Sequence, residues 1–466
     1  MYLRHLVNPQ KRVKGSNMKR KIYDKLQEWK KLSEGRSAVL IEGARRIGKS
    51  YIAEEFARHE YDSYILIDFS KAPKLVKDWF ELYLEDLDTL FMNLQLHYKQ
   101  KLFPRKSLII FDEVQDCPRA RAAIKHLVHD GRYDYLETGS LISINKNVKD
   151  ILIPSEEDHI DMYPMDFEEF LWAMGDEMLM PYIKTRYDNL KPMGDFHRRA
   201  MELFRQYMIV GGMPQAVLTY VETRDFDKVD YVKRQILRLY RNDIKKYAEG
   251  TETRATAIFE EIPGQLQKHE KKFRLSALKA EARMRDYADA FLWLGDARIV
   301  NCCYNTTAPS IGLKLNEERT TLKCYLGDTG LLISHAFDAR GIVGHEIYQK
   351  LMFGKLEINE GMLVENIVAQ MLVAAGHKLF FYSRYDELDA TNRMEIDFLI
   401  QKQVVTSRHN ISPIEVKSSS RYTLTSLNKC IKKYNNHLST PYVLHAADVK
   451  QENDIVYLPL YMTPLL

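Results

Sequence analysis

The chain has 466 residues, of which 45 % are hydrophobic and 28 % charged, a composition that supports two to four domains with buried cores. Its formal net charge of +4 is small for this length and does not by itself indicate a nucleic-acid-binding protein. The five cysteines form no C-x-x-C pair, which fits a reducing compartment and leaves no zinc motif. No apolar run approaches a membrane span, and the N-terminus lacks a signal-peptide core. We therefore expect a cytoplasmic protein without a membrane partner.

The first segment, residues 1–17, is basic and has no apolar periodicity. We expect a disordered tail there, and a nucleic-acid-binding arm is the alternative. A helix with Ile22, Leu26 and Trp29 on one face is predicted after Met18. Met1 and Met18 are therefore both candidate translation starts.

An apolar run over residues 38–41 leads into Gly43–Ser50, which reads G-x-x-x-x-G-K-S and continues with helical spacing. The backbone N–H groups of such a loop wrap phosphates, Lys49 reaches the β and γ phosphates, and the Ser50 hydroxyl can ligate Mg²⁺. A glycine turn without a ligand is the alternative. The sequence predicts ATP and Mg²⁺ as ligands. The predicted nucleotide-binding residues are Gly43, Ala44, Arg45, Arg46, Ile47, Gly48, Lys49, Ser50 and Tyr51.

Strand-like runs at residues 64–69 and 107–113 alternate with amphipathic helices, which is typical of a parallel sheet covered by helices. The second run ends in Asp112 and Glu113. In such a Walker B strand Asp112 would hold Mg²⁺, usually through water, and Glu113 would polarise the attacking water. We therefore predict Glu113 and Lys49 as catalytic, and Ser50 and Asp112 as metal ligands. A buried strand that ends in solvated acids is the alternative.

A further strand is predicted at residues 133–138. Thr138 or Ser140 would then lie beside the γ-phosphate as a polar sensor, and an ordinary strand end followed by a turn is equally consistent. No arginine that acts in trans is identifiable. Arg238 and Arg241 are candidates, but a solvated helical face explains them as well. The oligomeric state, whether homo-oligomer or complex with a protein partner, therefore stays open.

Several motifs together resemble a family of prokaryotic AAA-type ATP-binding proteins, which are similar to the archaeal-type ATPases and carry a C-terminal domain of unknown function. These motifs are Glu42–Ser50, Phe111–Gln115, Thr138–Ser140, Tyr163–Leu171, Val210–Pro214, Ile262–Leu266 and Tyr325–Leu332. The resemblance extends from about residue 18 through nearly the whole chain. It implies an ATPase fold and a winged helix. The substrates of the family are largely undefined, so the resemblance does not name one. Ser50 stands where threonine is more usual and still supplies the hydroxyl.

The middle of the chain is rich in helical spacing and is interrupted by Gly211–Pro214, which predicts a helical lid. Beyond it, a helical pair and an apolar strand are compatible with a winged helix, as the resemblance also implies. Basic and acidic residues are equally common between Leu275 and Arg298. A groove-reading helix normally presents a basic face, so we favour a structural or protein-contacting element over a DNA reader.

The C-terminal part predicts the element order α-β-β-β-α-β between residues 358 and 444, with Asp397 and Glu415-x-Lys417 on its strands. This order and motif resemble the core of PD-(D/E)xK nucleases. Asp397 and Glu415 would bind one or two divalent cations, and Lys417 would lie on the same strand face as Glu415. Glu365 could contribute from the helix. A fold retained only for docking, with Lys417 neutralising a buried carboxylate pair, is the alternative.

The predicted fold class is α/β, with a P-loop parallel-sheet ATPase domain, a helical lid, a winged-helix-like connector and a restriction-endonuclease-like C-terminal domain. The expected boundaries are a leader at 1–17, the ATPase core at 18–155, the lid at 156–250, the connector at 251–335 and the nuclease-like domain at 336–466. The leading hypothesis is an ATPase whose nucleotide state controls the nuclease-like module, with DNA as a candidate partner. The alternatives are a nucleotide-gated scaffold with an inactive nuclease fold, and a metal-dependent DNA endonuclease with regulatory ATP.

Overall fold

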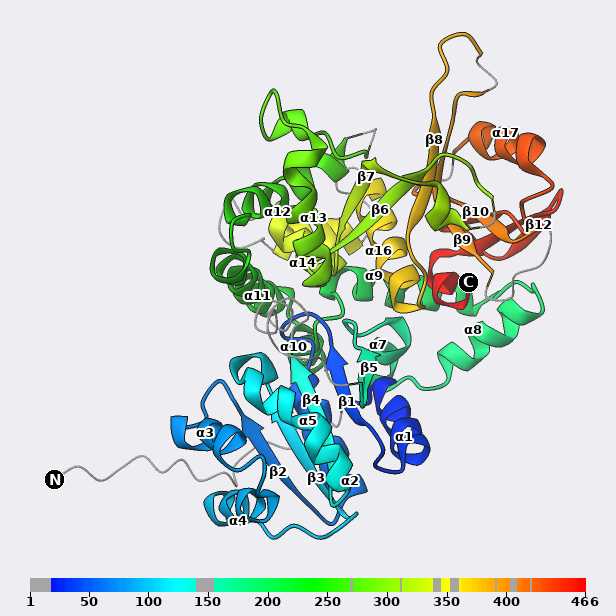
Figure 1. Cartoon of the computed structure of the whole chain (residues 1–466). Helices are drawn as coiled ribbons and strands as arrows, with labels where there is room; N and C mark the ends of the chain where they lie inside the picture. The colour runs from blue at the N-terminus through cyan, green and yellow to red at the C-terminus, as the bar shows by residue number, and fades with distance from the viewer. Residues whose placement is uncertain are drawn as a thin grey trace.

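The structure is a computed structural model that describes residues 18–139, 155–268, 271–310, 312–337, 345–352, 360–389, 392–402, 409–419 and 421–466. It contains two sheets, and helices lie between them and on their faces (Figure 1). None of the helices in these ranges combines the length and apolar character that crossing a bilayer demands.

The first sheet has five strands in the order β2-β3-β4-β1-β5, and every pair in it is parallel. The strands are β1 (Ala38–Glu42), β2 (Ser63–Asp68), β3 (Ser107–Asp112), β4 (Asp134–Gly139) and β5 (Glu157–Asp161). Parallel sheets are buried on both faces, which explains the continuous apolar runs of β1 and β3. The predicted parallel α/β core is thus confirmed.

Alternate residues of these strands face two different helical layers, as the two-residue period of a strand requires. Val39 and Ile41 of β1 share a core with helices α1 (Ile22–Ser33) and α2 (Lys49–Glu60). Their neighbours Ala38 and Leu40 pack in the layer of the opposite face. That layer contains α3 (Lys74–Leu82), α4 (Leu87–Tyr98) and α5 (Pro118–Asp130).

Strand β5 differs from the expectation that residues 156–250 form a helical lid. Its sequence, Glu-Asp-His-Ile-Asp, has a single apolar residue and gives no strand pattern by hydrophobicity. It nevertheless pairs in parallel with β1 over its whole length and forms one edge of the sheet. An edge strand tolerates charged side chains because only part of it is buried, which is why sequence periodicity missed it.

Helices dominate the chain after β5. They are α7 (Phe167–Ala173), α8 (Leu179–Asp188), α9 (Phe196–Val210), α10 (Pro214–Thr223), α11 (Phe226–Tyr247), α12 (Glu252–Gln267), α13 (Met284–Asp296), α14 (Thr329–Ala336), α15 (His345–Met352), α16 (Glu360–Ala374) and α17 (Thr425–Tyr434). Asp166 caps α7 reciprocally with Glu169, the capping box that starts a helix. α9 ends at Gly211, whose positive φ of 83° is cheap only for glycine.

The second sheet is mixed and has eight strands in the order β12-β13-β11-β10-β9-β8-β6-β7. The strands are β6 (Val300–Thr306), β7 (Glu317–Leu326), β8 (Phe380–Arg384), β9 (Met394–Gln401), β10 (Ile411–Val416), β11 (Tyr442–His445), β12 (Lys450–Glu452) and β13 (Ile455–Pro459). Because β6 pairs with β8, this sheet continues across the boundary expected between residues 335 and 336. The apolar strand expected to follow the helical pair of the winged helix is β6, which pairs with β7 at the edge of this sheet.

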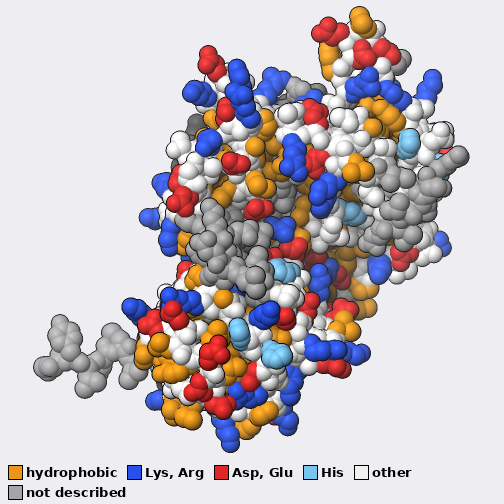
Figure 2. All heavy atoms as spheres, viewed as in Figure 1, with side chains coloured by type: hydrophobic (Ala, Val, Ile, Leu, Met, Phe, Trp, Pro, Cys, Tyr) orange, Lys and Arg blue, Asp and Glu red, His pale blue; other side chains and the backbone are white. Residues whose placement is uncertain are grey.

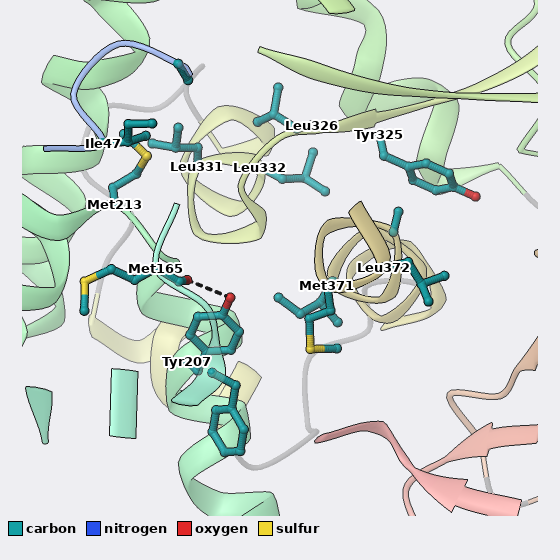
Figure 3. Packing of buried hydrophobic residues seen from close by; sticks show 14 of the residues in the cluster. Ile47, Met165, Tyr207, Met213, Tyr325, Leu326, Leu331, Leu332, Met371 and Leu372 are labelled. Atoms are coloured by element: carbon teal, nitrogen blue, oxygen red, sulfur yellow. Dashed lines mark hydrogen bonds between the residues drawn. The ribbon is translucent and has the colours of Figure 1, made fainter. Parts of the chain in front are cut away.

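One apolar cluster runs from α1 to the C-terminal sheet and joins the two halves of the molecule. It includes Ile47 of the glycine loop, Met213 before α10, Leu331 of α14 and Met371 of α16 (Figure 3). α17 lies on the other face of the second sheet with a smaller cluster around Leu427. The glycine loop therefore rests on the same core as the C-terminal sheet.

Candidate functional site

The glycine loop lies between β1 and α2, as the motif predicts. Gly43 and Gly48 have φ values of 157° and 94°. A side chain on Gly43 would place its Cβ 2.2 Å from the carbonyl oxygen of Met162, so glycine is required there by contact. Arg20, which lies outside the motif and is buried, donates to the carbonyl oxygen of Ile47 at 2.8 Å and pairs with Glu169 at 3.0 Å. Arg20 is a supporting residue that the sequence motif does not include.

Lys49 begins α2 and folds back over the loop. Its Nζ donates to the carbonyl oxygens of Gly43 at 3.0 Å and Ala44 at 2.9 Å. Burial lowers the pKa of Lys49, and the charges of Glu113 and Asp112 oppose that shift only in part. A phosphate group at this ammonium would supply the missing counter-charge, so the site fits an anionic ligand.

Asp112 ends β3 and faces the start of α2. The hydroxyl of Ser50 donates to Asp112 Oδ1 at 2.6 Å, and Thr138 Oγ1 of β4 donates to the same oxygen. Burial raises the pKa of Asp112, which means that the carboxylate lacks a full positive partner. A hydroxyl and a carboxylate are the hard oxygen ligands that Mg²⁺ prefers, so Ser50 and Asp112 fit this ion.

Glu113 directly follows Asp112 in a left-handed conformation, with a φ of 53°. This turn sends its side chain away from the strand and into the cavity beside Lys49. Gln115 Nε2 donates to Glu113 Oε2, and the backbone N–H of Glu113 donates to Thr138 Oγ1 at 3.3 Å. Thr138 thus contacts both acidic residues, whereas the second sensor candidate, Ser140, lies outside the described residues.

The cavity above the loop is closed by residues from a distant part of the chain. Its walls include Tyr240, Asp243 and Tyr247 of α11 and Trp293 of α13. Asp243 forms an ion pair with Arg45 of the loop, and the hydroxyl of Tyr240 donates to the carbonyl oxygen of Arg45 at 3.2 Å. Trp293 Nε1 donates to the carbonyl oxygen of Tyr247 at 3.1 Å. Sequence reasoning missed this wall because its residues lie on a helical stretch that reads only as amphipathic.

The two arginines considered as trans-acting candidates are both on α11. Arg241 donates from Nε and Nη2 to the two carboxylate oxygens of Glu260, at 2.7 and 3.1 Å. Arg238 is exposed on the same helix. Neither lines the cavity above the glycine loop.

The four residues of the nuclease-like prediction lie together at the second sheet. Glu365 belongs to α16, Asp397 to β9, Glu415 to β10, and Lys417 follows β10. The backbone N–H of Val416 donates to Asp397 Oδ2 at 2.9 Å, and Lys417 Nζ lies 2.6 Å from Glu415 Oε2. Burial and the charge of Asp397 raise the pKa of Glu415 to about 8.

Two lysines that the sequence motif does not contain also enter this group. Lys323 of β7 places Nζ 3.0 Å from Glu395 Oε1, 3.6 Å from Asp397 Oδ1 and 3.8 Å from Glu365 Oε1. Lys271 Nζ lies 3.0 Å from Glu365 Oε2. Within the described ranges, no group of three or more His, Cys, Asp or Glu side chains is arranged to hold a metal ion. The carboxylates at which a divalent cation was expected, Asp397 and Glu415, each have a lysine Nζ nearby, at 3.6 Å for Asp397 and 2.6 Å for Glu415.

DNA was a candidate partner. The face of the molecule in Figure 2 carries basic and acidic side chains intermixed, without a continuous basic surface. Electrostatic binding of nucleic acid uses such a surface, and DNA stays a candidate partner that this one face does not test.

Comparisons with known proteins agree with the loop geometry. The family model of the AAA domain matches residues 35–171. Two models, each described as a domain of unknown function, match residues 201–340 (DUF8612) and 360–462 (DUF4143). A search of curated proteins found no match.

Among solved structures, the chain is similar to a Walker-type ATPase of Pyrococcus abyssi, with 14 % identity, a TM-score of 0.41, and coverage of 68 % of this chain and 95 % of that chain. It is also similar to Drosophila ORC bound to DNA, with 12 % identity, a TM-score of 0.28, and coverage of 69 % and 95 %. A third similar structure is the ADP form of the ORC2 protein of Aeropyrum pernix, with 14 % identity, a TM-score of 0.23, and coverage of 72 % and 92 %. The family match and the strand-loop-helix geometry identify residues 35–171 as an AAA-type P-loop domain, an ATP-binding fold.

Proposed function

We propose that this protein hydrolyses ATP at the glycine loop and that the bound nucleotide sets the position of α11. The observation that carries the first part is that Lys49 and Glu113 line one cavity. Beside it, Ser50, the residue after Lys49, is hydrogen-bonded to Asp112. The observation that carries the second part is the ion pair between Arg45 of the loop and Asp243 of α11.

In the proposed reaction the loop N–H groups and Lys49 hold the β and γ phosphates. Ser50 and Asp112 would hold Mg²⁺, which supplies charge neutralisation at these phosphates when bound. Glu113 accepts a hydrogen bond from the attacking water and orients its oxygen toward the γ-phosphorus. The P–O bond to ADP breaks as the new bond forms, and the products are ADP and inorganic phosphate. Gln115 positions Glu113 through its side-chain amide.

A buried chain of hydrogen bonds connects the segment after β5 to α16, which packs on the second sheet. Tyr207 of α9 donates to the carbonyl oxygen of Met165 at 2.9 Å (Figure 3). Gln370 of α16 donates to the Tyr207 hydroxyl at 3.1 Å and accepts from the backbone N–H of Thr329 at 2.8 Å. Met165 follows β5 closely, so this chain joins the edge of the ATP-binding sheet to the helix that covers the second sheet. It supports control of the C-terminal module by nucleotide state.

The catalytic assignment is tested with Glu113→Gln. We expect this variant to bind ATP as the wild type does and to lose about 100-fold or more in turnover, because a positioned base contributes about that much. Lys49→Ala should weaken ATP binding itself, since it removes the ammonium that faces the phosphates. Calorimetric binding and phosphate release measure the two effects. Glu85→Gln, at an exposed position of the same domain, is the matched control. Equal turnover of wild type and Glu113→Gln would overturn the assignment.

A further inference from the structure

The group of charged side chains at the second sheet contains more lysines than a nuclease-like site requires. We call Glu365, Glu395, Asp397 and Glu415 the carboxylate cluster, and Lys271, Lys323 and Lys417 the lysine set. The carboxylates come from α16, β9 and β10, and Lys323 comes from β7 at the far edge of the sheet. Each carboxylate has at least one lysine Nζ within 3.8 Å.

Lys323 occupies the centre of the carboxylate cluster. Its side chain is 1 % exposed, and its Nζ lies within 3.8 Å of a carboxylate oxygen of each of Glu365, Glu395 and Asp397. The ring of Phe381 lies 5.1 Å from the same nitrogen. Burial alone would lower the pKa of Lys323, but the three carboxylates raise it above its ordinary value, so the amine stays charged.

This ammonium group and a divalent cation compete for the same oxygens. Mg²⁺ requires carboxylate oxygens at about 2.0–2.1 Å in near-octahedral geometry. An ammonium group 3.0–3.8 Å from those oxygens would repel an ion placed among them. Lys323 cannot simply turn to solvent, because it lies within a paired strand and opposite buried Cys303.

We propose that Lys323 and Lys271 fill the cation position of the nuclease-like module, so that the module binds no divalent cation at Asp397 and does not cleave phosphodiesters. The lysine set neutralises the carboxylates within the fold, and the module acts on its partners by binding. This proposal does not depend on ATP hydrolysis, because the glycine loop and the carboxylate cluster share no residue.

Mn²⁺ alone is the probe, measured by electron paramagnetic resonance on nucleotide-free full chain. All proteins carry Ser50→Ala, which removes the contribution of the glycine loop. With the lysine set intact, we expect no Mn²⁺ binding at the carboxylate cluster. Asp397→Asn should therefore leave the measured Mn²⁺ binding unchanged. Lys323→Ala should raise the Mn²⁺ affinity on the order of tenfold or more, because it removes the competing charge. Adding Asp397→Asn should cancel that gain. Lys272→Ala, a partly exposed lysine 4.0 Å from Glu395, is the matched control and should show no gain.

Two results would overturn the proposal. One is Mn²⁺ binding with the lysine set intact that disappears in Asp397→Asn. The other is cleavage of DNA or RNA by the wild-type chain that requires Mg²⁺ or Mn²⁺ and disappears in Asp397→Asn. Both results are obtained without Lys323→Ala, so they decide the question even if that variant does not fold. Phosphate release by the Lys323→Ala protein with Ser50 intact reports separately on ATP hydrolysis.

Discussion

Arg45 of the glycine loop forms an ion pair with Asp243, and under the proposed function a bound phosphate would compete for the same arginine. It belongs to the phosphate-binding loop, yet it pairs with Asp243, 198 residues further along the chain. The Arg45 side chain is 46 % exposed, and exposed ion pairs contribute little to stability. A γ-phosphate in the cavity offers Arg45 a more highly charged partner. Under the proposed function, we therefore expect this pair to exchange when ATP binds.

Asp243→Asn tests this exchange. The variant frees Arg45 and removes a negative charge from the cavity wall, so we expect ATP to bind about fivefold more tightly, equivalent to about 1 kcal/mol. ADP lacks the γ-phosphate and should gain less. Titration calorimetry gives both affinities, and the fluorescence of Trp293, which lines the same cavity, reports the position of α13.

The matched control is Asp289→Asn, an exposed carboxylate of α13 that does not line the cavity. It removes the same charge from the chain without touching Arg45. An equal gain for ATP and ADP in Asp243→Asn would show that Arg45 does not respond to the γ-phosphate.

At the scale of elements, the junction between α9, α10 and α14 joins the helical segment to the second sheet. Asp328 accepts from the backbone N–H of Gly212 at 2.6 Å and caps α14 through the N–H of Leu331 at 2.9 Å. Gly330 packs directly on the end of α9, where an added Cβ would lie 2.5 Å from the carbonyl oxygen of Val210. Only glycine allows these two helices to approach so closely.

Gly330→Ala should therefore destabilise the protein by about 1–3 kcal/mol, the usual cost of overpacking against a rigid backbone. Gly295→Ala is the matched control. Gly295 lies inside α13 with no atom near its added Cβ, so the same substitution should stabilise by about 0.5–1 kcal/mol. Chemical denaturation measures both free energies of unfolding. A Gly330→Ala protein as stable as the wild type would show that α9 and α14 separate easily.

The elements also show what sequence alone could predict. The parallel sheet and strands β8 to β11 of the second sheet follow from apolar runs, and the structure confirms the α/β class. The sequence did not predict that β6 and β7 join this second sheet. β5 escaped prediction because its charged residues carry no periodic signal. Glu113 and Asp112 follow from a local motif, whereas Lys323 and Asp243 reach their sites only through tertiary packing. A sequence motif reflects residues that are close along the chain. Lys323 and Asp243 instead meet partners that are far from them in sequence.

At the scale of the whole molecule, one apolar cluster joins the ATP-binding sheet to the C-terminal sheet, so we expect the two halves to unfold together. Lys233 of α11 lies fully buried in this region, where its Nζ donates to the carbonyl oxygen of Ile209 at 2.9 Å. Burial lowers the pKa of Lys233 from 10.5 to about 8, although Asp230 and Asp328 act in the opposite direction. At alkaline pH, the free energy of unfolding of the whole chain should therefore depend on the protonation of Lys233.

The sign of that dependence follows from proton binding. Between pH 8 and pH 10.5 the folded protein has released the Lys233 proton, while the unfolded chain still holds it. Stability rises with pH wherever the unfolded state binds more protons, so this residue should make the fold more stable across that interval. Relative to Lys233→Met, which cannot titrate, the wild type should gain on the order of 3 kcal/mol. Urea unfolding at several pH values measures the difference. Lys245→Met, on the exposed side of α11, controls for the added methionine, and a parallel pH profile of wild type and Lys233→Met would contradict the assignment.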